Sequence, residues 1–240
     1  QLAMASAFVW VIPHLGSEGG FAALGITALG GLAAAAWGPK SYGDLPTAPG
    51  ESGAPPLRGW AALLATLIYT AASGAVLVYL QPMTHEAGLS ADIARISLWV
   101  SLAAQVAGGF LATALAGRVH WFTVFCCSTV MFIAGWFVMT IHPSAWLFLA
   151  SNALTGLNIV LVGPFLVPMT IEADPSRRTA MQSGATQLLA GAMGPWLASM
   201  IVSDTDVFGA VWLGTGLIVS GLVLMGALHI TGLRARKKPL

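Results

Sequence analysis

Two long apolar segments, residues 145–171 and 179–202, contain no charged side chain and are joined by a short polar stretch, residues 172–178. An α-helix needs about 20 apolar residues to cross the roughly 30 Å hydrocarbon core of a bilayer, and both segments are long enough. Because lipid offers no hydrogen-bonding partner, a chain that crosses it has to satisfy its backbone groups within a helix. The sequence therefore predicts two consecutive membrane-spanning helices.

The polar stretch between these segments carries a helix-start signal and two positive charges. Asp174 precedes Pro175, and this order predicts the start of a helix, because Asp accepts hydrogen bonds from exposed amides and Pro needs no donor there. Arg177 and Arg178 follow, and arginines of this kind are enriched in cytoplasmic loops. We therefore expect a helical hairpin whose turn is cytoplasmic.

Composition indicates a membrane protein throughout. Hydrophobic residues make up 57% of the chain and charged residues 8%, and the mean hydropathy is +0.81. Soluble domains carry about a quarter charged residues, so this chain has too few to cover a surface exposed to water.

The net charge of +1 and the scattered basic residues argue against a nucleic-acid partner. Cys126 and Cys127 are adjacent in an apolar run, and helical neighbours point about 100° apart, which argues against a disulfide or a metal site.

Four more apolar segments predict four more crossings. They are residues 59–80, 96–116, 121–141 and 207–230. With the first pair they form a predicted six-helix bundle over residues 59–230, which a basic cytoplasmic tail, residues 231–240, follows. The predicted fold class is therefore an all-α integral membrane protein built as a multi-helix bundle.

The residues before this bundle predict the end of another one. Residues 2–12 are apolar but too short to span, so we expect them to be the end of a helix, and residues 20–37 predict a complete crossing. Residues 38–58 are rich in Pro and Gly and predict an extended cytoplasmic linker between the two bundles. Because the chain starts at Gln1 with an apolar run already under way, we expect a fragment of a longer protein.

Loop charges agree with this number of crossings. When successive loops alternate between the two sides, nine of the ten lysines and arginines fall on one side and only Arg95 falls on the other. The positive-inside rule expects such a bias for a cytoplasmic C-terminus. We therefore expect a multi-pass protein of a bacterial inner (plasma) membrane.

Several short patterns give the chain a resemblance to the major facilitator superfamily. Two of them, Pro13-x-x-Gly16 and Gly191-x-x-Gly194-Pro195, are similar to the bends of that family's fifth and eleventh helices. A third, Leu115-Ala116-x-Arg118, is similar to the family's Leu-Ala-Asp-Arg loop. The fourth, Asp174-Pro175-x-Arg177-Arg178, is similar to the loop before its eleventh helix. The resemblance implies the end of helix 5 through helix 12 of a twelve-helix protein, without its first four helices. It also implies a secondary transporter of small organic solutes that works by alternating access.

The resemblance further implies that residues 59–80 and 145–171 line a substrate cavity. Asn152, Thr155 and Asn158 recur at every third position and lie along one side of their helix. Amides that face lipid are unfavourable, so this side should face protein or a watery cavity. The candidate cavity-lining residues are Tyr69, Thr70, Ser73, Asn152, Thr155 and Asn158. Hydrogen bonding between helices is the alternative role for all of them.

Glycines with a proline predict helices that cross closely and bend. The candidates for helix bending and gating are Gly108, Gly109, Gly191, Gly194 and Pro195. The candidate cytoplasmic loop residues are Arg118, Asp174, Arg177 and Arg178.

No complete predicted crossing contains Asp, Glu, Lys or Arg, so either a coupling proton is carried by the missing half or transport is not coupled to protons. The five histidines lie near predicted helix ends, where we expect ordinary solvated behaviour.

Two alternative functions remain. One is an intramembrane enzyme, since Ala72-Ser73-Gly74 resembles a nucleophile turn, although it has no facing histidine or zinc signature. The other is a seven-helix receptor or sensor. The expected partners are a small-molecule substrate and the lipid bilayer, and no catalytic residue, metal or cofactor is expected.

Overall fold

A computed structural model describes residues 54–203 and 206–236, together with isolated positions between residues 19 and 37 that are all helical. The chain divides into two compact units, residues 1–49 and 50–240, and helices α2–α8 belong to the second. The predicted partial helix at residues 2–12 lies outside the described residues, and so does most of the predicted linker.

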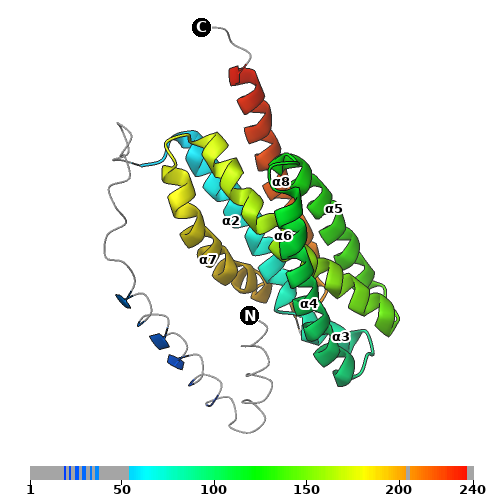
Figure 1. Cartoon of the computed structure of the whole chain (residues 1–240). Helices are drawn as coiled ribbons and strands as arrows, with labels where there is room; N and C mark the ends of the chain where they lie inside the picture. The colour runs from blue at the N-terminus through cyan, green and yellow to red at the C-terminus, as the bar shows by residue number, and fades with distance from the viewer. Residues whose placement is uncertain are drawn as a thin grey trace. The chain divides into compact units, whose positions relative to one another are not determined.

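Seven helices follow one another in the described part of the second unit, and no strand is present there (Figure 1). They are α2 (Leu57–Leu77), α3 (Leu80–Glu86), α4 (Ala91–Leu115), α5 (Trp121–Thr140), α6 (Ala145–Ala173), α7 (Arg178–Ser199) and α8 (Gly209–Arg236). Five of them, α2, α4, α5, α6 and α8, are long and apolar enough to cross a membrane. The all-helical class is therefore confirmed for the described residues, and the five apolar helices are compatible with a multi-pass membrane protein.

Helix α7 differs from the prediction of a sixth equivalent crossing. It is a helix of 22 residues, but it is not among the five that are apolar enough to span by composition alone. Polar side chains cluster in its first half, at Gln182, Ser183, Thr186 and Gln187. These polar side chains lower the mean hydropathy of α7, although the second half of the helix is apolar.

The predicted polar loop after the first crossing is also largely helical. The chain breaks after α2 and forms the short helix α3, in which Pro82 occupies the first turn, where a missing amide donor is tolerated. Helix α4 begins at Ala91, before the predicted start at residue 96. Asp92 lies in its first turn, where a negative charge is favourable, and accepts a hydrogen bond from Arg95 at 2.9 Å.

The ends of α6 and α8 also differ from the prediction. Helix α6 continues to Ala173, so that Glu172 belongs to its last turn and not to the polar turn. Helix α8 continues to Arg236, so that the predicted tail at residues 231–240 begins inside a helix. Basic residues near a helix C-terminus are favourable because the last carbonyl groups carry partial negative charge, which explains why α8 runs on through Arg234.

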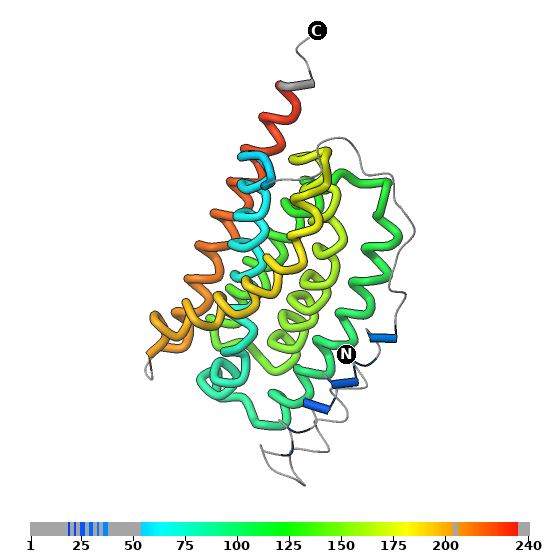
Figure 2. The backbone as a smooth tube through the Cα atoms, turned by 90° about the vertical axis from the view of Figure 1, so that its left-hand side faces the viewer, coloured from blue at the N-terminus to red at the C-terminus, as the bar shows by residue number. Residues whose placement is uncertain are grey.

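The helices contact one another in a swapped arrangement. Helix α2 lies against α7 and α8, whereas α6 lies against α4 and α5 (Figures 1 and 2). In sequence order, α2, α4 and α5 form a first triplet, if short α3 is set aside, and α6, α7 and α8 form a second. The first helix of each triplet therefore contacts the second and third helices of the other triplet.

The second helix of each triplet buries only a narrow stripe of mostly small residues. In α4 this stripe is Ser97, Ser101, Gly108 and Ala112, and in α7 it is Thr179, Ser183, Ala190 and Gly194, with Ala198 one turn further. Successive members lie four, seven and four residues apart in both helices, a spacing that keeps them on one side of a helix. Small residues at such positions let two helix backbones approach closely in a membrane.

Glycines mark the closest of these helix crossings. A Cβ atom added at Gly108 would collide with the Leu157 carbonyl oxygen of α6, and one added at Gly194 would collide with the Ala71 carbonyl oxygen of α2. By contrast, a Cβ atom at Gly109 would meet only Val160 Cγ1, at an ordinary 3.7 Å, and one at Gly191 would meet nothing within 4 Å. Among the predicted bending residues, Gly108 and Gly194 therefore lie at tight helix contacts, whereas Gly109 and Gly191 do not.

The third helix of each triplet also approaches its partner at a glycine. A Cβ atom at Gly221 of α8 would lie 3.1 Å from the backbone nitrogen of Tyr69 in α2. One at Gly135 of α5 would lie 3.3 Å from the Ser151 carbonyl oxygen of α6. All four contacts of the swapped arrangement thus include a glycine at the crossing.

We predict that Gly108→Ala lowers the free energy of unfolding by about 1–3 kcal/mol, because the added methyl group must push α4 away from the α6 backbone. Thermal unfolding of the detergent-solubilised protein, followed by circular dichroism, measures the change. The matched control is Gly109→Ala, next to it on the same helix, which should leave stability within about 0.5 kcal/mol because its methyl group has room. Equal destabilisation by the two substitutions would contradict the close crossing.

Candidate functional site

A cavity of about 1100 Å³ opens at the end of the bundle where α2, α5 and α7 begin and α4, α6 and α8 end. Its walls are apolar side chains of α6 and the connection between α4 and α5, and its charged residues are Arg58, Arg118 and Glu172. The other lining residues are Ala116, Gly117, Val119, His120, Trp121, Pro164, Phe165, Val167, Pro168, Ile171, Pro175 and Gly232.

Local backbone chemistry shapes two walls of this cavity. Gly117 has a φ of +72°, a left-handed conformation that suits glycine, and it turns the chain from α4 into α5. Pro164 and Pro168 lie inside α6, where each removes one backbone donor from the helix. The tight turn brings His120 and Trp121 to the cavity from one side, and the last turns of α6 bring Glu172 from another.

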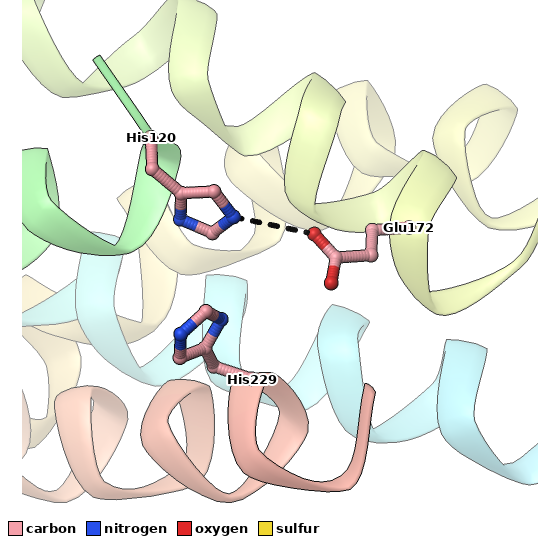
Figure 3. Close-up of side chains that lie close together, drawn as sticks. All are labelled: His120, Glu172 and His229. Carbon is pink, nitrogen blue, oxygen red and sulfur yellow. Dashed lines mark ion pairs between the residues drawn. The ribbon is translucent and has the colours of Figure 1, made fainter. Parts of the chain in front are cut away.

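Three titratable side chains from three helices converge beside the cavity: His120, Glu172 and His229 (Figure 3). One nitrogen or oxygen atom of each lies within 4.8 Å of the others. His120 Nε2 lies 3.7 Å from Glu172 Oε2, with side-chain exposures of 43% and 14%. An ion pair this long and partly exposed contributes at most about 1 kcal/mol, so this pair by itself adds little to the stability of the bundle.

Neighbouring aromatic residues fix the orientation of this cluster. The indole Nε1 of Trp121 donates a hydrogen bond to Glu172 Oε2 at 2.7 Å. The ring of His229 stacks on Phe122, with centroids 4.8 Å apart and planes inclined by 15°. His120 caps α5, because its Nδ1 accepts a hydrogen bond from the Phe122 amide at 3.2 Å. The buried Nδ1 atom of His229 has no hydrogen-bond partner among the described residues.

Arg58 extends the cluster toward α2. Its Nη2 donates to the Leu228 carbonyl oxygen at 2.9 Å and so ties the start of α2 to the end of α8. A Cβ atom at Gly232 would lie 2.5 Å from Arg58 Nη2 and 3.0 Å from Glu172 Oε1. The guanidinium and the carboxylate therefore both occupy space that any larger residue at position 232 would fill.

This cluster is not predicted by any sequence pattern. The sequence predicts solvated histidines, whereas His229 is half-buried against Phe122, and it predicts Glu172 in a polar turn, whereas Glu172 lies in the last turn of α6. One signal was present, because the predicted crossings put Arg58, His120, Glu172 and His229 at the same end of the bundle. Their spacing in the sequence matches no motif, so only the three-dimensional structure brings them together.

The predicted polar stripe of α6 lies inside the bundle. Asn152 is fully buried, and its Nδ2 donates to the Ser97 carbonyl oxygen of α4 at 2.6 Å. Thr155 and Asn158 are also buried and donate to carbonyl oxygens one turn earlier in α6, at 3.0 Å and 2.8 Å. The Oδ1 atoms of both asparagines have no hydrogen-bond partner among the described residues. Asn152 thus joins two helices, whereas the hydrogen bonds that Thr155 and Asn158 donate stay within α6.

The predicted polar residues of α2 are distributed differently. Tyr69 is buried, accepts a hydrogen bond from the Thr129 hydroxyl at 3.2 Å and meets the ring of Phe125 edge-on. Thr70 and Ser73 are half-buried, and the Ser73 hydroxyl donates to the Thr70 carbonyl oxygen at 2.9 Å. None of the six predicted cavity-lining residues lines the cavity at the end of the bundle. Substrate contact at these residues stays a prediction.

Among the predicted loop residues, Arg118 lines that cavity and Asp174, Arg177 and Arg178 do not, and the start of α7 differs from the prediction. Helix α7 begins at Arg178, and Arg177 before it adopts a left-handed conformation with a φ of +64°. Asp174 instead follows the last residue of α6 as its C-cap. The predicted helix start at Asp174 and Pro175 is therefore wrong, although the Asp174 carboxylate does accept a hydrogen bond from the Thr179 amide in the first turn of α7. The helix starts later because Asp174 is extended and Arg177 is left-handed, and neither conformation continues an α-helix.

That carboxylate is held by four hydrogen bonds. It accepts from the amide and hydroxyl of Ser176 at 3.1 Å and 2.6 Å, and from the amide and hydroxyl of Thr179 at 3.1 Å and 2.9 Å. Burial alone would raise the pKa of Asp174, but these hydrogen bonds favour the charged form more strongly and lower its pKa below the usual 3.8. The connection between α6 and α7 is thereby fixed at neutral pH.

Comparison with known proteins finds no match: no protein-family model, no curated protein and no solved structure matches this chain.

We predict that Asp174→Ala lowers the free energy of unfolding by about 0.5–2 kcal/mol at pH 7, the usual range for loss of a helix cap. The pKa of Asp174 is lower in the folded protein, so its contribution is complete above the unfolded-state pKa, near 3.8, and declines as the pH falls through the folded-state value. Thermal unfolding scans at pH 7 and below pH 3.8 should show the difference from wild type shrinking at acid pH.

The control for this experiment is Ser144→Ala, because Ser144 precedes α6 without making a side-chain cap hydrogen bond. Its substitution should change stability little at either pH. A difference between Asp174→Ala and wild type that persists below the folded-state pKa would show that the carboxylate acts by something other than its charge.

Proposed function

We propose that this protein is a secondary transporter that moves small organic solutes across a membrane by alternating access, with α2–α8 as one of two helical bundles. The observation that carries the proposal is the swapped contact of α2 with α7 and α8 and of α6 with α4 and α5. Inverted repeats of three helices, nested in one half of a transporter, produce such an arrangement. In this proposal the half-bundle has the architecture of the major facilitator superfamily.

The directions of the helices support an inverted repeat. Helix α2 begins at the end of the bundle where α6 finishes, so the first helices of the two triplets run in opposite directions (Figure 1). The matching stripes of small residues in α4 and α7 bury equivalent sides of the two second helices. Two triplets of opposite direction with equivalent contacts are what an inverted duplication would leave in a chain whose sequence repeat has been lost.

The exposed sides of α4 and α7 suit contact with a second bundle. On α4, Phe110 is 75% exposed, and on α7, Met181 and Leu188 are 85% and 80% exposed. A Cβ atom added at Gly184 or Gly191 of α7 would meet no neighbouring atom within 4 Å, so this side of α7 is smooth. In the proposal a second bundle rocks across these two helices, and the polar half of α7 faces the solute pathway and not lipid.

The chemistry of the predicted lining favours neutral or amphipathic solutes. The polar candidates on α2 and α6 are hydroxyl and amide groups without charge, so this bundle need not pair a charge on the solute. Asn158 keeps a carbonyl oxygen without a hydrogen-bond donor among the described residues. A hydroxyl or amide group of a solute would supply that donor when the helices part.

The enzyme alternative gains nothing from the structure. The Ser73 hydroxyl donates to a carbonyl oxygen of its own helix, and no hydrogen bond between described residues joins it to a histidine. A serine nucleophile needs an adjacent base to accept its proton.

The proposed orientation follows the positive-inside rule, with the end that carries Arg58, Arg118, Arg177 and Arg178 on the cytoplasmic side.

We predict that Asn158→Leu lowers kcat/KM for solute uptake about tenfold, the loss expected for one hydrogen bond to a solute. The measurement is uptake of a panel of neutral and amphipathic solutes by proteoliposomes that contain the protein with both of its helical bundles, because alternating access needs the two together. Because the Asn158 amide bonds only within its own helix, membrane insertion and thermal stability should stay close to wild type.

Asn152→Leu is the matched comparison, since it replaces an equally buried amide that joins α6 to α4. It should lower thermal stability, whereas Asn158→Leu should not. Unchanged uptake kinetics for Asn158→Leu would remove this residue from the site. Uptake no faster than that of protein-free vesicles for every solute in the panel would contradict transport itself.

A further inference from the structure

We propose that His120, Glu172 and His229 bind a divalent transition-metal ion of the zinc class. Each ligand comes from a different helix end: His120 from the start of α5, Glu172 from the last turn of α6, and His229 from α8 (Figure 3). A bound ion would therefore join three helices at one end of the bundle. Metal binding here does not depend on the transport function and is tested separately from it.

The distances fit an ion after small side-chain movements. Ligand atoms in a tetrahedral zinc site lie about 3.4 Å apart, because each is about 2.0–2.2 Å from the metal. Here the three nearest ligand atoms lie within 4.8 Å of one another, and the side chains already point toward a common centre (Figure 3). Rotation of side chains alone, without movement of the helices, can close a gap of this size.

The ligand types select the class of metal. Two imidazoles and one carboxylate suit zinc and its neighbours cobalt, nickel and copper, whereas magnesium and calcium prefer sites built only from oxygen atoms. His120 and Glu172 line the cavity, which gives the ion a path from solvent and leaves room for a water molecule as a fourth ligand.

The surroundings resemble the supporting shell of a metal site. Metal-bound carboxylates and histidines are oriented by further hydrogen bonds and packing. The Trp121 indole holds one oxygen of Glu172, and Phe122 holds the ring of His229 by stacking. The Nδ1 atom of His229 is buried without a hydrogen-bond partner among the described residues, and a metal ion would satisfy it.

Two features limit the affinity. His120 Nδ1 accepts a hydrogen bond from the Phe122 amide, so a neutral ring carries its proton on Nε2. To bind a metal through Nε2, the ring has to move that proton to Nδ1 and give up the cap. The positive charge of Arg58, close to the other oxygen of Glu172, also repels a cation. We therefore expect reversible binding in the micromolar range, and not a permanently filled structural site.

Cobalt is the probe, because Co²⁺ has visible absorption bands and accepts the same ligands as zinc. The protein is purified without a histidine tag, freed of metal with a chelator and titrated with Co²⁺ in detergent. We expect saturable absorption at one ion per chain, reversed by Zn²⁺ and unaffected by excess Mg²⁺. Absence of saturable binding by either Co²⁺ or Zn²⁺ would overturn the proposal.

Each ligand has a substitution that keeps its other contacts. His120→Asn retains a side chain that can cap α5, Glu172→Gln retains an acceptor for the Trp121 indole, and His229→Phe retains the aromatic stack. Each should weaken Co²⁺ binding at least tenfold. Arg58→Gln should strengthen binding, because it removes a like charge. The matched control is His85→Asn, an exposed histidine of α3 outside the cluster, which should bind as wild type does.

A measurement on the wild-type protein covers the case in which a variant does not fold. Diethyl pyrocarbonate modifies accessible histidines, and mass spectrometry locates the modified positions. Zn²⁺ should protect His120 and His229 and leave His85 reactive. Equal modification with and without Zn²⁺, or ligand variants that bind Co²⁺ as tightly as wild type, would contradict the site.

Discussion

Close contact between helix backbones is the constraint on which the rest of this structure depends. In a bilayer, apolar side chains gain little by moving from lipid to protein, so helices associate through van der Waals contact and need small residues where they cross. Gly108 of α4 and Gly194 of α7 fulfil this need against Leu157 and Ala71. Because both glycines lie in similar buried stripes, the two second helices contact their partners in equivalent ways within the swapped order of the bundle.

The swapped order of the helices decides which side chains meet at the end of the bundle where the cavity opens. With α2 against α8 and α5 against α6, the ends of these four helices come together, and they carry Arg58, His229, His120 and Glu172. The hydrogen bonds from Arg58 to Leu228 and from Trp121 to Glu172 then each join one such pair. The polar cluster is thus a consequence of helix order, and its residues need no proximity in the sequence.

Much of the fold could be predicted from the sequence, because hydropathy over some twenty residues decides where a membrane helix forms. The predicted spans of α5 and α6 are correct nearly to the residue, whereas α3 is missed because seven residues with an internal Pro82 give no such signal. The cluster around Glu172 could not be predicted, since it depends on the last turn of α6 and on tertiary contacts. The burial of Asn152 against Ser97 likewise follows from a helix pairing that no local pattern specifies.

The four hydrogen bonds to Asp174 have a mechanical consequence. They hold the end of α6 against the start of α7, two helices that belong to different sides of the swapped arrangement. A displacement of the end of α6 is therefore passed on to the start of α7, because the turn that joins them is fixed by its own hydrogen bonds and cannot lengthen. The turn thus acts as a rigid link between the two groups of helices.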